Sequence, residues 1–255
     1  MVSAAPIRRL TDFITLIERL VTEWGGSPPF WFRGQAQADW RLEPKLFRFE
    51  RPDETALRID FRRLGMEMIT GSKPVDHWEW YFLAQHFGTP TRLLDWTESA
   101  LFALYFAVRH RNSGDHRGNA AVWLLDPKWL NEKAGIRPNL LIPGNEIDSW
   151  LPQDERGKVK AISPIAVAPP HVDRRVAAQR SQFVLFGLNP AGLSDLVSVH
   201  DSRLKRIEIE GRAASNLFEE LTLCGIYETT LFPDLEALAR ELQEKYAGPK
   251  KRPAK

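Results

Sequence analysis

Apolar residues recur at helical spacing near both ends of the chain, and an aromatic segment lies between them. The stripe over residues 10–24 predicts an amphipathic helix that ends at Gly25. The aromatic segment 29–34 follows and predicts a short strand. Because side chains alternate along a strand, Trp31 and Arg33 are expected on the same face of it.

The remaining periodicity predicts a single α+β domain. Helices are predicted after Pro52 and over 76–87, 98–110, 213–224 and 233–246, and strands over 120–125, 182–186 and 204–209. The helix at 98–110 is apolar nearly all round and is expected to be buried. In the last helix, Leu235, Leu238 and Leu242 are expected to face inward. Residues 126–170 are rich in Pro and Gly, and we expect them to be an irregular excursion.

We therefore expect a central mixed or antiparallel sheet with flanking helices. Residues 1–27 would form an N-terminal helix packed on the domain, residues 28–246 the domain itself, and residues 247–255 a basic, disordered tail.

Composition narrows the class of protein. The 255 residues are 43% hydrophobic, which excludes a disordered chain, and 35 Lys and Arg residues nearly balance 33 Asp and Glu residues. The single cysteine, Cys224, cannot pair within the chain, and no apolar run is long enough to cross a bilayer. No secretory signal is evident, so a cytoplasmic protein is expected.

The common chemical templates are absent from the sequence. It contains no Gly-rich dinucleotide fingerprint, no phosphate loop, no zinc-ligand spacing and no Gly-x-Ser-x-Gly elbow. We therefore expect no metal site.

Three segments place polar residues within apolar structure. In the first, Arg33 beside Gly34 could present its guanidinium to a phosphate or, equally, pair with a structural carboxylate. In the second, residues 85–97, the ordinary account is a structural ion pair between Arg92 and Asp95. The third, residues 174–179, carries arginines that suit a surface as well as a site.

These segments carry a resemblance to a known family. WFRGQ, LAQHFGTPTRLLDWTESALFALYFA, RRVAAQRSQF and LFPDLEAL occur in that order and resemble the FRG domain, which is named for the triplet Phe32-Arg33-Gly34. The resemblance runs from about residue 28 to residue 242 and would make residues 28–246 an FRG domain.

A second resemblance is to ADP-ribosyltransferases of the Arg-Ser-Glu type. Arg33-Gly34 matches the end of their first strand, residues 95–97 stand where their Ser-Thr-Ser strand leads into a helix, and Gln179 precedes the third strand. The chain departs from that pattern in two places, because Ser181 stands where the catalytic Glu is expected and Asp95 replaces the first Ser.

The second resemblance implies an ADP-ribosyltransferase-like fold and a use of NAD, or a related nucleotide, as substrate. Arg33 would clamp the pyrophosphate, Asp95 would stabilise the positive charge that develops on the ribose, and Gln179 would bond the ribose. The nucleotide-binding residues implied are Trp31, Arg33, Gly34, Gln35, His86, Arg92, Trp96 and Thr97.

The resemblances imply a bacterial effector, a toxin or a phage-defence component that transfers a group to a protein or nucleic-acid acceptor. Two alternatives stay open at this point. One is a noncatalytic module that binds a nucleotide or nucleic acid, and the other is an interaction domain whose tryptophans only fill the core. A carboxylate facing Arg33 across a cleft would favour the transferase over the noncatalytic module. The sequence does not indicate an oligomeric state.

Overall fold

A computed structural model describes residues 6–26, 29–69, 73–109, 118–139, 141–142, 145–151, 159–169, 178–196 and 202–246. The strands are β1 (Trp31–Gln35), β2 (Leu93–Thr97), β3 (Ala120–Leu125), β4 (Ile165–Val167), β5 (Ser181–Leu185) and β6 (Leu204–Ile209). The α-helices are α1 (Leu10–Glu23), α2 (Glu54–Gly65), α3 (His77–His86), α4 (Ala100–Val108), α5 (Pro127–Lys133), α7 (Gly192–Leu196), α8 (Ala214–Leu223), α9 (Glu228–Leu231) and α10 (Leu235–Tyr246). Short 3₁₀ helices are η1 (Lys45–Arg48), η3 (Asn145–Trp150) and η4 (Gly211–Ala213).

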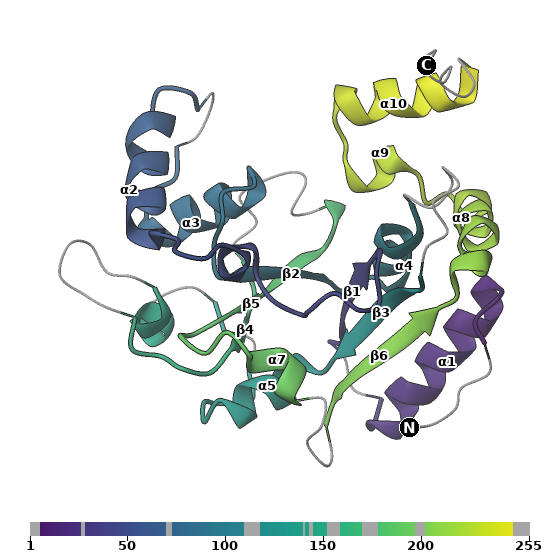
Figure 1. Cartoon of the computed structure of the whole chain (residues 1–255), viewed down its shortest axis with the longest axis horizontal. Coiled ribbons are helices and arrows are strands. Elements are labelled where there is room, and N and C mark those ends of the chain that lie inside the picture. Colours follow the sequence, from purple (N-terminus) through teal and green to yellow (C-terminus); the bar gives the residue numbers. More distant parts are fainter. Residues whose placement is uncertain are drawn as a thin grey trace.

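The six strands form one sheet in the order β4-β5-β2-β1-β3-β6, and each pair of neighbouring strands is antiparallel. Helices lie on both faces of this sheet (Figure 1). The expected α+β class with a central sheet is confirmed, and the sheet is antiparallel throughout its named strand pairs.

The sheet is weakly joined at its middle. β1 pairs with β3 along its whole length, from Trp31 opposite Leu125 to Gln35 opposite Ala121. Between β1 and β2, the described chain has one paired position, Phe32 opposite Thr97. Beyond that position the two strands separate. The sheet therefore consists of two halves that are joined at a single pair of residues.

The core follows this division. On one face, Phe32 and Val122 pack with α1, α4 and α8, whereas Phe183 and Leu185 pack with α3 in a separate cluster. On the opposite face, one cluster runs under both halves and includes Trp31, Trp96, Trp123 and Trp129. α5 and α7 contribute to this second layer (Figure 1). The separation of the first two clusters leaves room for a pocket over the middle of the sheet.

Gly34 sets how closely α4 approaches β1. A Cβ at this position would lie 1.9 Å from the carbonyl oxygen of Ala103 and 2.7 Å from the backbone nitrogen of Ala107. The helix backbone therefore rests directly on the strand. The triplet glycine is required by packing, because any side chain would have to displace α4.

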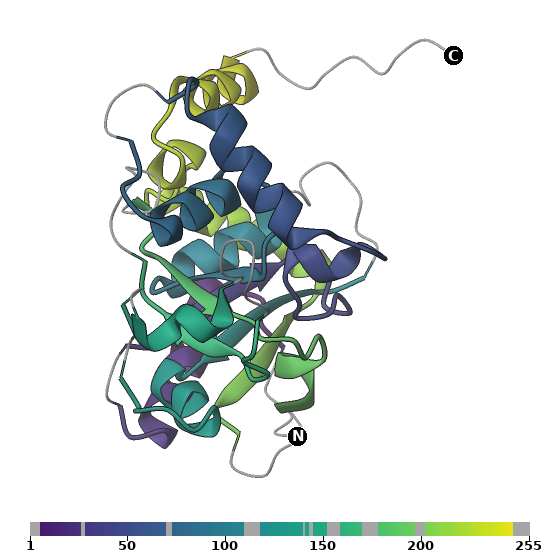
Figure 2. The same ribbon diagram turned by 90° about the vertical axis from the view of Figure 1, so that its left-hand side faces the viewer.

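Two expectations for the second half of the chain were wrong. Residues 126–170 are not wholly irregular, since they contain α5, whose first turn is capped by Asp126, as well as η3 and β4. Leu235, Leu238 and Leu242 do not face inward, because they are 82%, 41% and 46% exposed on α10. α2 and α10 lie at the same end of the molecule (Figures 1 and 2). The basic segment 247–255 lies outside the described residues.

In the part of the chain that the structure describes, no helix combines the length and apolar character that a bilayer crossing requires.

Replacing Gly34, the glycine of the Phe-Arg-Gly triplet, should destabilise the protein. We expect Gly34→Ala to lower the free energy of unfolding by about 3 kcal/mol or more, because the added methyl overlaps backbone atoms that cannot move separately. In a domain of this size the melting temperature would fall by about 6 °C or more.

The matched control is Gly65→Ala, whose added Cβ would meet only the Trp80 ring at 3.6 Å. This change near the end of α2 should leave the melting temperature unchanged or raise it slightly. Equal melting temperatures for wild type and Gly34→Ala would contradict the packing role.

Candidate functional site

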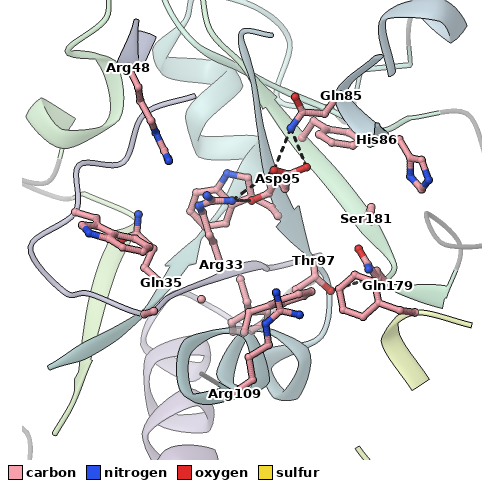
Figure 3. A pocket seen from close by; sticks show the side chains of 18 residues that line it. Arg33, Gln35, Arg48, Gln85, His86, Asp95, Thr97, Arg109, Gln179 and Ser181 are labelled. Carbon is pink, nitrogen blue, oxygen red and sulfur yellow. Dashed lines mark hydrogen bonds and ion pairs between the residues drawn. The ribbon is translucent and has the colours of Figure 1, made fainter. Parts of the chain in front are cut away.

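A pocket opens where β1 and β2 part, and it has a volume of about 460 Å³. Its polar lining comes from β1, η1, α3, β2, the end of α4 and the segment 178–181 (Figure 3). It is lined by Phe32, Arg33, Gly34, Gln35, Ala36, Trp40, Arg48, Gln85, His86, Asp95, Trp96, Thr97, Phe106, Arg109, Gln179, Ser181, Phe183 and Phe232. We call it the Arg33 pocket.

Arg33 bridges the gap between the two strands. Its Nη1 donates a hydrogen bond of 2.6 Å to the backbone carbonyl of Asp95 and lies 3.8 Å from Oδ2 of the same residue. The Arg33 side chain is 17% exposed, whereas that of Asp95 is 59% exposed. The guanidinium is thus held inside the pocket, and the carboxylate is accessible from it.

Gln85 orients the Asp95 carboxylate. Its Nε2 lies 3.0 Å from each carboxylate oxygen, and its Oε1 accepts a hydrogen bond from the hydroxyl of Thr91 (Figure 3). The Thr91 oxygen also accepts from the backbone N–H of Leu93, so its own proton is directed to Gln85. This chain fixes the amide with its NH₂ toward Asp95, so the carboxylate is held in one orientation.

The lining is predominantly cationic. Arg48 and Arg109 join Arg33, and Figure 3 shows Arg109 rising from the end of α4. The Arg109 guanidinium carbon lies 5.1 Å from the Phe106 ring centre and 5.4 Å from that of Phe232. Burial lowers the pKa of Arg33, and nearby Arg48 lowers it further, while Asp95 opposes both. Asp95 supplies the one carboxylate of the described lining, so the pocket suits an anionic ligand.

Two buried donors at the pocket have no acceptor within the described chain. These are Nε of Arg33 and Nε1 of Trp96. Buried N–H groups normally have partners, and an unmet one costs about 1–3 kcal/mol. Both atoms belong to residues expected to bind a nucleotide.

Gln179 and Thr97 join the third segment to β2. The Thr97 hydroxyl donates to the backbone carbonyl of Gln179 at 2.7 Å, and Nε2 of Gln179 donates to the carbonyl of Leu231. Ser181 lies opposite Thr97 across β2 and β5. Thr97, Gln179 and Ser181 thus line the same pocket as Arg33 and Asp95. Residues 171–177, which include the arginines at 174 and 175, lie outside the described residues.

Arg92 lies elsewhere, and its expected pairing with Asp95 was wrong. It is 2% exposed, and its Nε lies 3.0 Å and 2.8 Å from the two carboxylate oxygens of Glu54. Its other nitrogens donate to the carbonyls of Phe186 and Trp150. The hydroxyl of Tyr81 donates to Glu54, and burial raises the pKa of that tyrosine. Arg92 therefore does not line the pocket, and Asp95 is not committed to it.

Three further predicted residues, Trp31, Gln35 and Gly34, offer no unpaired side-chain polar atom to the pocket. Trp31 is fully buried in the cluster on the opposite face and does not line the pocket. Gln35 lines it, but its Oε1 accepts from Nε1 of Trp123 and its Nε2 donates to the carbonyl of Arg41. Gly34 serves the packing of α4.

His86 lines the pocket, and its ring packs edge-on against Phe87. Sequence reasoning missed Gln85, Arg48 and Arg109. Gln85 stands in the quoted segment LAQHFG beside His86, so its position was available, whereas no pattern marks Arg48 or Arg109.

The described side chains form no metal centre, since no three His, Cys, Asp or Glu residues among them lie close enough to share an ion.

Residues 28–116 match the family model of the FRG domain. The chain carries an FRG domain. Searches of curated proteins and of solved structures returned no match.

The FRG match covers about a third of the chain, and it contains most of the polar lining of the pocket. Arg33, Arg48, Gln85, Asp95 and Arg109 all fall within it. The wall formed by Gln179, Ser181, Phe183 and Phe232 lies beyond the match. In this chain the FRG domain therefore supplies the charged groups, and the following segment completes the cavity.

The two Arg–carboxylate pairs should respond differently to substitution. We expect Arg92→Met to lower the free energy of unfolding by about 3–5 kcal/mol, because it leaves the 13%-exposed carboxylate of Glu54 without its cation. Asp95→Asn should change it by less than about 0.5 kcal/mol, because that side chain is largely exposed. Urea unfolding measures both values, and equal losses would refute the division into a structural and a functional pair.

Proposed function

We propose that the Arg33 pocket binds NAD or a related nucleotide and that the protein is an ADP-ribosyltransferase-like enzyme. The observation that carries the proposal is the placement of an accessible carboxylate, Asp95, against the buried guanidinium of Arg33 within one cavity. That arrangement favours the transferase over a noncatalytic binding module, because a module that only binds phosphate has no use for a carboxylate beside its arginine.

The lining groups suit the parts of such a ligand. Arg33, Arg48 and Arg109 would neutralise the pyrophosphate, and the unmet Nε of Arg33 is a donor for one of its oxygens. The rings of Phe106, Phe183 and Phe232 offer apolar surface for a base or a nicotinamide. Trp31 cannot contact the base or the nicotinamide, because its side chain is fully buried outside the pocket.

Asp95 would act on the bond between the nicotinamide and the ribose. Breaking that bond develops positive charge on the sugar, and an ionised carboxylate nearby lowers the energy of the transition state. Gln85 holds both oxygens of Asp95 in place before the substrate arrives. No group has to reorganise at the moment of reaction, which is how fixed dipoles and charges contribute most.

Ser181, at the start of β5, stands where the resemblance expects the catalytic Glu, and the proposal assigns the role of that carboxylate to Asp95 on β2. Glu98 follows β2 but is engaged by the amide of Gln182 at 2.9 Å. Asp95 is therefore the carboxylate that the pocket presents among the described residues. The proposed biological setting, a bacterial effector, toxin or defence component, rests on the family resemblance.

Calorimetric titration with NAD tests the binding step. Arg33→Ala should weaken binding at least tenfold, because a charge-assisted hydrogen bond is worth about 1.5–3 kcal/mol. Arg33→Lys keeps the charge and should retain part of the affinity if the fold is intact. Arg19→Ala removes an exposed arginine from α1 and should bind as wild type does. Absence of NAD binding by the wild type would overturn the proposal.

Nicotinamide release tests the chemical step. Asp95→Asn should bind NAD within about threefold of wild type but release nicotinamide about 100-fold more slowly or worse, as expected for loss of an electrostatic stabiliser. Glu219→Gln, at an exposed position on α8, is the charge-matched control and should keep the full rate. Binding by the wild type without any release of nicotinamide would favour the noncatalytic module instead.

A further inference from the structure

A second hollow lies directly beside the Arg33 pocket and shares Asp95 with it. Its volume is about 390 Å³, and both cavities are lined by Arg33, Arg48, Gln85 and Asp95. The hollow adds Lys45, Phe49, Gly88, Thr89, Leu93 and Leu94. We call it the Lys45 recess. Asp95 and Arg33 therefore stand at the boundary between two cavities.

Lys45 and Arg48 project from the same side of η1. This helix runs from Lys45 to Arg48, and a 3₁₀ helix has three residues per turn, so its first and last side chains are aligned. Figure 3 shows Arg48 reaching toward Arg33. The short helix thus presents two cations to the recess.

The charges of these two side chains are not neutralised by the chain as far as it is described. Nζ of Lys45 donates to the carbonyl of Gly88 at 2.6 Å, and Nη2 of Arg48 donates to the carbonyl of Glu43 at 3.3 Å. Both acceptors are uncharged. With Arg33 the recess has three cations around one carboxylate, an excess that an anion would balance.

An exposed aromatic ring accompanies these cations. Phe49 follows η1 directly, lines the recess and is 51% exposed. Cations beside an exposed ring form the arrangement that binds single-stranded nucleic acid, since the cations hold phosphates and the ring stacks on a base.

We propose that the Lys45 recess binds the acceptor of the transfer reaction, and that this acceptor is a nucleotide in a single-stranded nucleic acid. The inference rests on the proposed use of NAD in the Arg33 pocket. Lys45 and Arg48 hold a backbone phosphate of the strand, and Phe49 stacks on a base. Asp95 then lies between the bound NAD and the bound strand.

This placement suits the reaction. The bond from the ribose carbon to the nicotinamide breaks, and its electron pair leaves on the nicotinamide nitrogen. A lone pair on a base nitrogen or a nucleotide oxygen forms the new bond to that carbon, and the proton displaced from the acceptor passes to water or to Asp95. The acceptor approaches the ribose carbon from the side opposite to the departing nicotinamide, so the proposal places these two groups in the two cavities that share Asp95.

Fluorescence anisotropy with a labelled 12-nucleotide strand tests the recess independently of catalysis. Lys45→Ala should weaken binding about tenfold at low salt and reduce the slope of log affinity against log salt by about 0.7, as for one lost phosphate contact. Lys133→Ala is the control, since that exposed lysine lies on α5 and lines neither cavity. An equal loss in both variants would overturn the specific site, and so would unchanged binding in Lys45→Ala.

Two further experiments identify the acceptor. Competition with AMP distinguishes the source of the phosphate, because binding of AMP as tight as that of the strand would replace the nucleic acid with a free nucleotide. NAD carrying a radioactive phosphate should label the strand in the wild type, and label on protein alone would overturn the proposal.

The failures of the two proposals are distinguishable. Nicotinamide release without any Lys45-dependent strand binding would refute the proposal for the Lys45 recess. It would still support the proposed reaction of NAD in the Arg33 pocket. Strand binding that depends on Lys45, with no binding of NAD, would support the recess as a nucleic-acid site and remove its role as an acceptor site.

Discussion

The hydrogen bond from Arg33 to the backbone of Asp95 spans the one place where the sheet is nearly divided. β1 and β2 pair at Phe32 and Thr97 and then part, and the guanidinium occupies the space that opens. A cation in such a position serves two purposes. It ties the two strands together where backbone pairing ends, and it places positive charge inside the cavity that their separation creates.

The molecule assigns its two Arg–carboxylate pairs to different tasks. Arg92 and Glu54 are buried together with Tyr81, and this cluster holds α2 and α3 against the start of β2. Arg33 and Asp95 share the pocket, where the carboxylate is accessible and is oriented by Gln85. Because Arg92 is satisfied by Glu54, Asp95 is left available for chemistry.

The sequence predicted a good part of this arrangement. The strands around Trp31 and Ala120, the buried helix after β2, and the gathering of Arg33, Asp95, Thr97 and Gln179 followed from periodicity and from family resemblance. The prediction that Arg92 pairs with Asp95 was wrong, and the spacing of the two residues in the sequence explains why. Residues three apart along an extended strand point to opposite faces, so these two side chains could not meet. Arg48 and Arg109 could not be predicted, since only the folded chain brings η1 and the end of α4 to one cavity. The exposed leucines of α10 show a different limit, because an apolar stripe predicts a helix face but does not say what covers it.

The single rung between Phe32 and Thr97 has a mechanical consequence. Backbone ladders resist shear and bending in proportion to the number of bonds that cross them, and here the described ladder is at its thinnest. Each half of the sheet keeps its own core on the pocket side, so a small rotation of one half against the other disturbs little packing there. Any such rotation would change the span between residues 33 and 95, which crosses the gap between the two halves beside the cavity.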